Sequence, residues 1–181
     1  CGSSTTERGC AISDMGLAKA VSAEILEHSV PFCSDFPIRE PLPDGLVLGG
    51  SGALGIYVGY RFSAPFARTL RLVPRVLRVG VGCRRGISRE AVEEAIGKVF
   101  AENRLDPAAI LGVFSIDLKE HEPGLLAACA AHGWPAHFYS ASQLQAVPGE
   151  FTGSDFVRAV TGVENVCERA AFLDVERLLV K

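Results

Sequence analysis

The amino-acid sequence predicts an α/β protein with two parts: a small α/β region, followed by a three-layer C-terminal domain with a mainly parallel sheet. From residue 74 onward, apolar stretches of strand length alternate with amphipathic stretches of helix length. Such alternation makes the strands parallel, because each helix returns the chain across the sheet in a right-handed crossover. Glycine and proline clusters separate the stretches, as expected of connecting turns.

The first region, residues 1–73, begins with a polar segment, residues 1–10, that we expect to be loose. Residues 14–28 predict an amphipathic helix, with Leu17, Val21 and Ile25 on one face. Three strands are expected after it, at 30–36, 52–62 and 66–73. A proline-rich turn, 37–45, separates the first two. We place the domain boundary at Val73–Pro74.

The second region, residues 74–181, is more regular. Ser88 is a suitable N-cap for a helix over 88–104, and Gly133 is suited to end a helix over 122–133. Ser154 can cap a helix over 154–160. The other expected helices are 141–147 and 163–175, and the expected strands are 75–82, 108–118, 135–140 and 176–181. In such sheets, ligand sites form beyond the carboxyl ends of the strands.

The composition is that of an ordinary globular protein. The 181 residues are 48% apolar and 22% charged, and no apolar run reaches the roughly 18 residues that span a bilayer. The six cysteines form no C-x-x-C pair, so we expect free or buried thiols in a reducing cytoplasm and no bound metal. The chain starts at Cys1 and its only methionine is Met15, so we expect a fragment or processed chain.

Positive charge is concentrated between Arg61 and Arg89, where eight arginines and no acidic residue occur in a chain of net charge −3. This segregation favours an anionic partner. Nucleic acid fits poorly, because only Phe62 and Phe66 are interleaved and the whole chain is acidic. A polycarboxylate or phosphate small molecule fits better. The alternative is a strand face whose arginines are simply solvated.

The turn G-V-G-C-R-R-G, residues 80–86, is a candidate anion site. It lacks the third glycine of a dinucleotide fingerprint and the Gly-Lys-Ser/Thr of a P-loop. Backbone N–H groups near Gly82 can still approach an anion, and Arg84 and Arg85 add planar donors suited to carboxylates. A purely structural turn is the alternative. Cys83 lies beside these guanidiniums and a helix start, which would favour its thiolate, but no histidine motif supplies a base, so a packed or substrate-lining thiol is preferred.

Two further segments carry polar side chains. Ser115, Asp117 and Lys119 share one face of an extended segment, where Asp117 can act as a general base and Lys119 can stabilise an oxyanion. An ordinary ion pair or a helix-entry cap is the alternative, and Glu122 can cap the following helix. In the other segment, Glu164 and Glu168 lie one helical turn apart beside Arg169, and a solvated face is the alternative there. This segment also offers polar groups from Thr161 and Asn165, while Val166 and Ala170 pack inward.

The motif G-V-G-C-R-R-G-I-S resembles the C-terminal domain of the CbiG family of cobalamin biosynthesis. Three blocks follow in the family's order: S-I-D-L-K-x-x-E-P-G-L-L at 115–126, E-F-T-G-S-D-F-V at 150–157 and V-T-G-V-E-N-V-C-E-R-A-A at 160–171. Segments at 13–26, 34–46 and 68–77 resemble the family's middle region. Residues 1–10 match nothing in the family, and its N-terminal domain and final strand are missing. CobE, of the aerobic pathway, shares the C-terminal domain but not the middle region.

The resemblance implies a cytoplasmic hydrolase that opens the ring A acetate δ-lactone of cobalt-precorrin-5A and releases acetaldehyde, giving cobalt-precorrin-5B. It implies no cofactor, because the substrate carries the cobalt. The implied partners are the cobalt-corrinoid tetrapyrrole and neighbouring corrin-pathway enzymes, with neither nucleic acid nor membrane. Such a macrocycle is ringed with carboxylates, which suits the arginine-rich stretch.

The residue roles rest on side-chain chemistry alone. Asp117 is the first choice of base and Glu168 the second, with Lys119 or N–H groups stabilising the oxyanion. Gly82, Cys83, Arg84 and Arg85 would hold a peripheral carboxylate. A non-catalytic tetrapyrrole carrier resembling CobE is the alternative function, and a nucleotide-binding module is a third.

Overall fold

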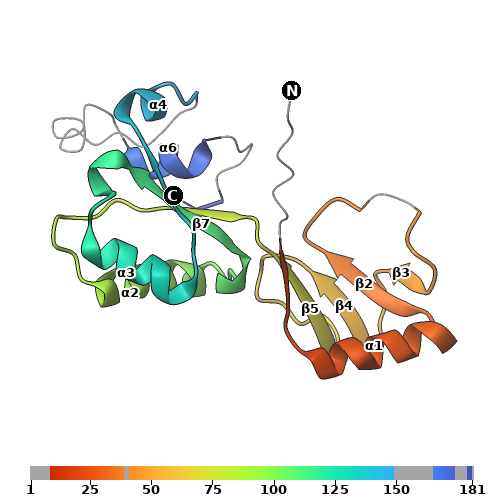
Figure 1. Ribbon diagram of the computed structural model, residues 1–181. Coiled ribbons are helices and arrows are strands. Elements are labelled where there is room, and N and C mark those ends of the chain that lie inside the picture. Colours follow the sequence, from red (N-terminus) through yellow and green to blue (C-terminus); the bar gives the residue numbers. More distant parts are fainter. Residues whose placement is uncertain (1–8, 39–40, 149–164, 174–178, 181) are drawn as a thin grey trace. The chain divides into compact units, whose positions relative to one another are not determined.

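The computed structural model describes residues 9–38, 41–148, 165–173 and 179–180 and divides the chain into two compact units (Figure 1). The first unit contains Cys1–Val76 and also Arg104–Ala109. The second contains Leu77–Asn103 and Ile110–Lys181. The division therefore falls between Val76 and Leu77, and the return of Arg104–Ala109 to the first unit was not predicted.

The first unit contains one five-stranded sheet with the order β1-β5-β4-β2-β3. β1 is antiparallel to β5, and the other neighbouring strands are parallel. The strands are β1 (Cys10–Ile12), β2 (Val30–Ser34), β3 (Leu46–Leu48), β4 (Leu54–Val58) and β5 (Arg68–Pro74). The sequence predicted β2, β4 and β5, whereas β1 and β3, each three residues long, were too short to show a periodic pattern.

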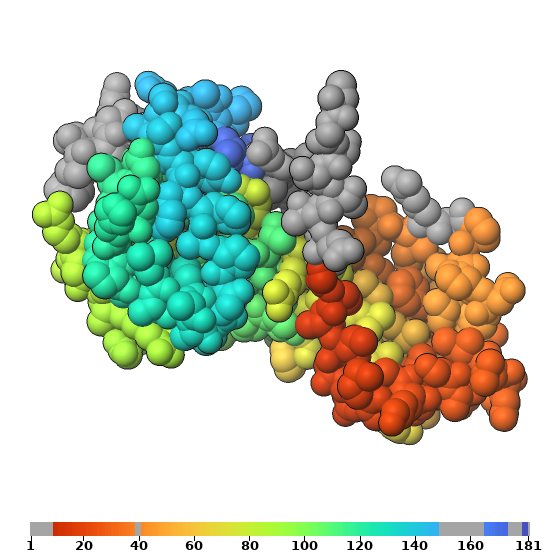
Figure 2. Space-filling model, in the orientation of Figure 1, coloured from red at the N-terminus to blue at the C-terminus, as the bar shows by residue number. Residues whose placement is uncertain are grey.

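Helix α1 (Met15–Glu27) packs on the sheet of the first unit, as predicted. It begins where the Asp14 side chain accepts a hydrogen bond from the Leu17 N–H, 2.9 Å away. Val21 is buried in a core cluster with Val30, Ile56 and Leu70, and Leu17 and Ile25 pack against that cluster. The opposite face is solvent-exposed, and Figure 2 shows α1 in red and orange on the outside of this unit.

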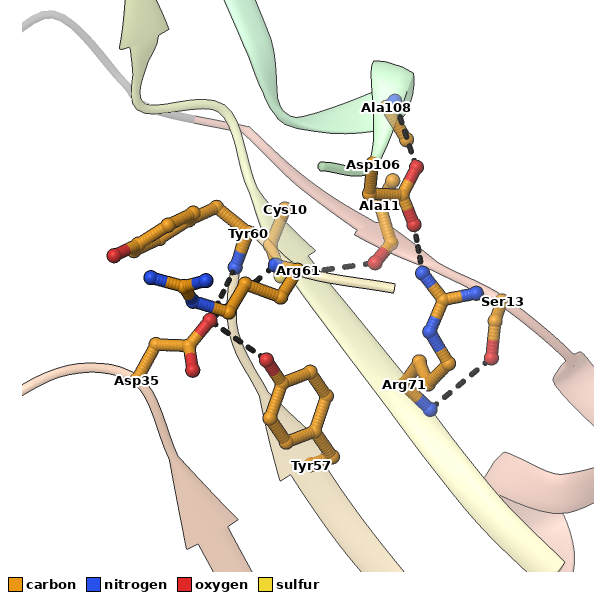
Figure 3. A network of polar contacts seen from close by, with 10 residues as sticks. All are labelled: Cys10, Ala11, Ser13, Asp35, Tyr57, Tyr60, Arg61, Arg71, Asp106 and Ala108. Carbon is orange, nitrogen blue, oxygen red and sulfur yellow. Dashed lines mark hydrogen bonds and ion pairs between the residues drawn. The ribbon is translucent and has the colours of Figure 1, made fainter. Parts of the chain in front are cut away.

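The carboxyl ends of β2 and β4 are joined by a polar network around Asp35 (Figure 3). Its Oδ2 atom accepts the Tyr57 hydroxyl at 2.6 Å and the backbone N–H groups of Tyr60 and Arg61 at 3.2 and 3.3 Å. Burial, followed by the Asp35 carboxylate, raises the pKa of Tyr57, so its hydroxyl remains a donor. A side chain at Gly59 would overlap both Tyr57 and Asp35. The network therefore fixes the turn after β4.

A second polar contact attaches the returning segment to the first unit. The Arg71 guanidinium on β5 donates to Asp106, and the two side chains are only 13% and 10% exposed (Figure 3). The other oxygen of Asp106 accepts the Ala108 N–H at 2.9 Å. The 3₁₀ helix Pro107–Ala109 follows. Arg71 is thus a structural residue rather than part of an exposed cationic face.

The second unit has a parallel sheet of three strands in the order β6-β7-β8. These strands are β6 (Leu77–Gly80), β7 (Ile110–Ile116) and β8 (Ala136–Tyr139). Among the described residues, the α-helices of this unit are α2 (Arg89–Glu102), α3 (Pro123–His132), α4 (Ala141–Gln145) and α6 (Val166–Phe172). Helices α2 and α3 pack together, while α6 packs on β6 and β7. Figure 1 shows α2 and α3 on one side of β7 and α6 on the other. The predicted three-layer α/β architecture is confirmed.

The predicted helix ends are also confirmed where the structure describes them. The Ser88 side chain accepts the Ala91 N–H at the start of α2, and Gly133 ends α3 with a φ of 64°. The predicted helix at 154–160 lies outside the described residues, as does most of the predicted strand at 176–181. Within the ranges described, every helix is too short or too polar to cross a membrane.

Candidate functional site

The candidate site is built around the turn between β6 and α2, residues 81–88. The sheet extends slightly into this turn, because the Val81 N–H donates to the Phe114 carbonyl at 2.9 Å. The Ser115 hydroxyl then donates to the Val81 carbonyl at 2.6 Å. Ser115, predicted to contact a ligand, is only 1% exposed. The structure thus uses its hydroxyl to fasten the turn to β7.

Two glycines allow α6 to approach this turn closely. A Cβ atom on Gly80 would overlap the Cys167 carbonyl, and one on Gly82 would overlap the Cys167 Sγ atom. The closeness explains the pattern G-x-G better than nucleotide binding does. Gly82 was predicted to bind a carboxylate through its backbone, and that role stays a prediction.

Replacing Gly80 by alanine should destabilise the protein by about 1–3 kcal/mol, because the added methyl group meets helix backbone that must shift. The matched control is Gly97 inside α2, where nothing lies within 4 Å of an added Cβ. Gly97→Ala should instead stabilise by about 0.5–1 kcal/mol, since alanine favours a helix. Urea unfolding measures both values. Equal effects of the two changes would contradict the close approach of α6.

Glu122 links the turn to the segment after β7. Its Oε1 atom accepts the Gly86 N–H at 2.6 Å, and its Oε2 atom lies 3.8 Å from the Lys119 ammonium. The carboxylate is 6% exposed. The sequence had suggested that Glu122 caps α3, but its side chain makes no cap hydrogen bond. The sequence signal that could have predicted the pair with Lys119 was its i, i+3 spacing, because this spacing brings two side chains together on one turn of helix.

Asp117 and Lys119 do not continue the strand. β7 ends at Ile116, and Asp117–Lys119 form a 3₁₀ helix. The expectation that Ser115, Asp117 and Lys119 share one face of an extended segment was therefore wrong beyond Ile116. The tighter turn nevertheless keeps both charged residues at the carboxyl edge of the sheet. Asp117 is partly exposed, and the Lys119 side chain is 20% exposed.

The thiol of Cys83 lies close to the charged pair. Burial is the main influence and raises the pKa of Cys83, while the Lys119 ammonium lowers it and the Glu122 carboxylate raises it. The expectation that neighbouring arginines favour the thiolate was wrong. Cys83 therefore resembles the packed thiol that the sequence favoured over a nucleophile.

The eight arginines of the segment 61–89 are divided between the two units. Four belong to the first unit and four to the second. In the second unit, Arg78 is partly buried, donates to the Tyr139 hydroxyl and the Ala171 carbonyl, and lies over the Phe114 ring. Arg84 and Arg85, by contrast, are exposed on the turn itself. The cationic character of the candidate site thus comes from these two residues and Lys119.

The first turn of α6 lies beside the site. Asn165 accepts the Glu168 N–H at 3.2 Å and so acts as an N-cap, and its φ of 51° turns the chain into the helix. Val166 and Ala170 are buried, as predicted. Glu168 is partly exposed and raises the pKa of Cys167, though burial of that thiol is the larger cause. Thr161 and Glu164, which the sequence also singled out in this segment, lie outside the described residues.

The arrangement combines a hydrogen-bonded glycine turn, two exposed guanidiniums, a largely buried ammonium and a partly exposed carboxylate at one edge of a parallel sheet. Such a group can bind carboxylates, accept a proton from water and stabilise an oxyanion. Fold and site therefore define a three-layer α/β protein with a candidate anion site at the carboxyl ends of its parallel strands.

Comparison with known proteins identifies the family. The family described as cobalamin synthesis G C-terminus matches residues 77–181, and the chain belongs to it. A cobalt-precorrin-5A hydrolase of Priestia megaterium is 36% identical over 100 residues, which are 55% of this chain and 26% of that protein. The hydrolase of Salmonella typhimurium is 33% identical over 103 residues, 57% of this chain and 29% of that protein. The family and these relatives indicate cobalamin biosynthesis.

A solved structure is also similar. CobE, described as a protein from the cobalamin (vitamin B12) biosynthetic pathway, superposes with a TM-score of 0.50 and 31% identity. The superposition covers 53% of this chain and 71% of CobE. The match to the two hydrolases spans less than a third of their length.

Proposed function

We propose that this chain takes part in opening the ring A acetate δ-lactone of cobalt-precorrin-5A, with release of acetaldehyde and formation of cobalt-precorrin-5B. The observation that carries the proposal is that Glu122 contacts both Gly86, in the turn of residues 81–88, and Lys119, at the carboxyl edge of the sheet. The turn proposed to bind carboxylates and the ammonium proposed to stabilise an oxyanion are thus linked through one side chain, which supports a role on a lactone with neighbouring acetate groups. The cobalt ion enters with the substrate.

In this proposal, water attacks the lactone carbonyl while the Asp117 carboxylate takes its proton. The Lys119 ammonium stabilises the oxyanion that forms, and its low exposure strengthens the interaction. The bond between the carbonyl carbon and the ring oxygen then breaks, and that oxygen becomes a hydroxyl on the two-carbon fragment. For acetaldehyde to leave, this hydroxyl gives up its proton and becomes a carbonyl while the C–C bond between the fragment and the macrocycle breaks. The macrocycle keeps the electron pair of that bond and takes up a proton. Glu168, on the neighbouring first turn of α6, is the second candidate base. Arg84 and Arg85 hold peripheral carboxylates of the macrocycle.

A non-catalytic carrier of the tetrapyrrole is the second candidate function. The likeness to CobE favours it, because the chain covers a larger share of CobE than of the hydrolases. In this case the turn binds the intermediate and passes it to the next corrin-pathway enzyme, while other residues open the lactone.

One experiment separates the two functions. The chain is incubated with cobalt-precorrin-5A under anaerobic conditions, and both bound corrinoid and released acetaldehyde are measured. Release of acetaldehyde at one equivalent per substrate supports the hydrolase. Stable binding without release supports the carrier. The absence of both binding and release would contradict both functions for this chain.

Removing the two exposed guanidiniums should weaken tetrapyrrole binding by about 10- to 100-fold, because each charge-assisted contact contributes roughly 1 kcal/mol at an exposed position. The test variant is Arg84→Gln with Arg85→Gln. The control is Arg68→Gln with Arg75→Gln, which removes the same charge from exposed positions of the first unit. Corrinoid titration measures both affinities. An equal loss in the control would mean that general charge, and not the turn, attracts the ligand.

A further inference from the structure

Two cysteines that the proposed reaction does not use belong to the same part of the candidate site, one in the turn 81–88 and the other in the helix that packs against this turn. Cys167 is in the first turn of α6, and its Sγ atom lies so close to Gly82 that a side chain there would overlap it. Cys83 is the residue that follows Gly82. The two residues are 84 positions apart in sequence, yet the packing of α6 on β6 places Cys167 against the residue that precedes Cys83.

The surroundings of both thiols favour the protonated form at neutral pH. Each is a free cysteine of intermediate exposure. Burial is the main cause that raises the pKa of either thiol, and a negative charge on Cys83 further raises the pKa of Cys167. This effect of Cys83 on Cys167 agrees with the contact between Cys167 and Gly82, the residue before Cys83. The pair is therefore slow to react at neutral pH but accessible enough to react when a thiolate forms.

We propose that Cys83 and Cys167 are a dithiol modification site that small-molecule disulfides oxidise to an intramolecular disulfide. The inference goes beyond the proposed function and depends only on the contacts of Gly82 and Cys167. The disulfide would link the turn of residues 81–88 covalently to α6 and so restrict the turn to one position.

The chemistry is thiol–disulfide exchange with glutathione disulfide as oxidant. The Cys83 thiolate attacks one sulfur of glutathione disulfide, which forms a mixed disulfide and releases one glutathione thiolate. The Cys167 thiolate then attacks the Cys83 sulfur and releases the second glutathione. Two cysteine thiols are oxidised, one glutathione disulfide is reduced to two thiols, and the two cysteine protons end on them.

The test uses the whole folded chain, equilibrated with mixtures of reduced and oxidised glutathione at pH 8 and then alkylated. Trypsin cleaves at Arg78, Arg84, Arg158 and Arg169, so mass spectrometry should find peptide 79–84 linked to peptide 159–169. The matched control is Cys129→Ser on α3, which should leave the link intact. In Cys83→Ser or Cys167→Ser the link must disappear, and the remaining cysteine should carry glutathione.

Two measurements can overturn the inference. A folded chain in which Cys83 and Cys167 both end as stable glutathione adducts, or pair with other cysteines, contradicts it. The rate of linkage should also rise about tenfold per pH unit between pH 7 and 8.5, because only the thiolate attacks. A rate that does not change with pH would contradict it as well. Repeating the oxidation in urea should scatter the links over all six cysteines, which shows that the folded structure selects the pair.

Discussion

Replacing Asp117 by asparagine is expected to lower acetaldehyde release from cobalt-precorrin-5A by about 100- to 10,000-fold. The size follows from the loss of a general base, since an amide cannot take a proton from the attacking water. The substitution keeps the shape of the side chain, so the 3₁₀ helix Asp117–Lys119 should remain intact. Corrinoid affinity should change little. The measurement is the single-turnover rate of acetaldehyde formation at saturating protein.

The matched control for this prediction is Glu120→Gln, three residues further along. Glu120 is also a carboxylate but is exposed at the end of the same 3₁₀ helix. Its loss should leave the rate within about twofold of the original. Full turnover by the Asp117→Asn variant would exclude Asp117 as the base. The next variant is then Glu168→Gln, and a large loss there would place the base on α6.

The second large effect concerns stability. Asp106→Ala should lower the free energy of unfolding by about 3 kcal/mol, because the change leaves the Arg71 guanidinium buried without its carboxylate. The Ala108 N–H also loses its acceptor, which detaches the start of the 3₁₀ helix Pro107–Ala109. Urea unfolding monitored by circular dichroism gives the value. Asp44→Ala, at an exposed carboxylate of the same unit, should cost less than about 0.5 kcal/mol.

A double variant distinguishes a broken ion pair from lost packing. Arg71→Met combined with Asp106→Ala removes both charges, so no guanidinium remains desolvated. We expect the double variant to recover most of the stability that Asp106→Ala loses. If the destabilisation of the double variant equals the sum of the destabilisations by Arg71→Met and Asp106→Ala alone, the ion pair itself contributes nothing to stability, which would mean that solvent screens it.

The sequence predicted those parts of the fold that depend on local chemistry. Ser88 precedes an amphipathic run and caps its helix as predicted, because a short oxygen-bearing side chain can reach the free N–H groups. Asp14, which was placed inside the predicted helix 14–28, is instead the N-cap of α1. Gly133 ends α3 because glycine adopts positive φ without steric cost. The alternation of strands and helices was enough to predict parallel pairing.

The site was predicted less completely, because its decisive contacts are distant in sequence. Nothing in the segment 80–86 indicates that Cys167 lies against Gly82, and nothing near Glu122 indicates that it bonds to Gly86. Burial also reversed one expectation: Cys83 has basic neighbours in sequence, but desolvation determines its pKa. Likewise, Arg71 stands in a cationic run, yet it is paired inside the first unit.

The return of residues 104–109 to the first unit determines where this protein can be divided. The family match begins at residue 77 and includes this segment, although these six residues pack with the preceding unit. A gene cut between codons 76 and 77 would therefore separate Arg71 from Asp106. The first product would keep the arginine without its carboxylate, and the second would keep the aspartate without its guanidinium. A fusion protein that takes over residues 77–181 alone would have to include residues 1–76 as well, or carry a redesigned segment at residues 104–109.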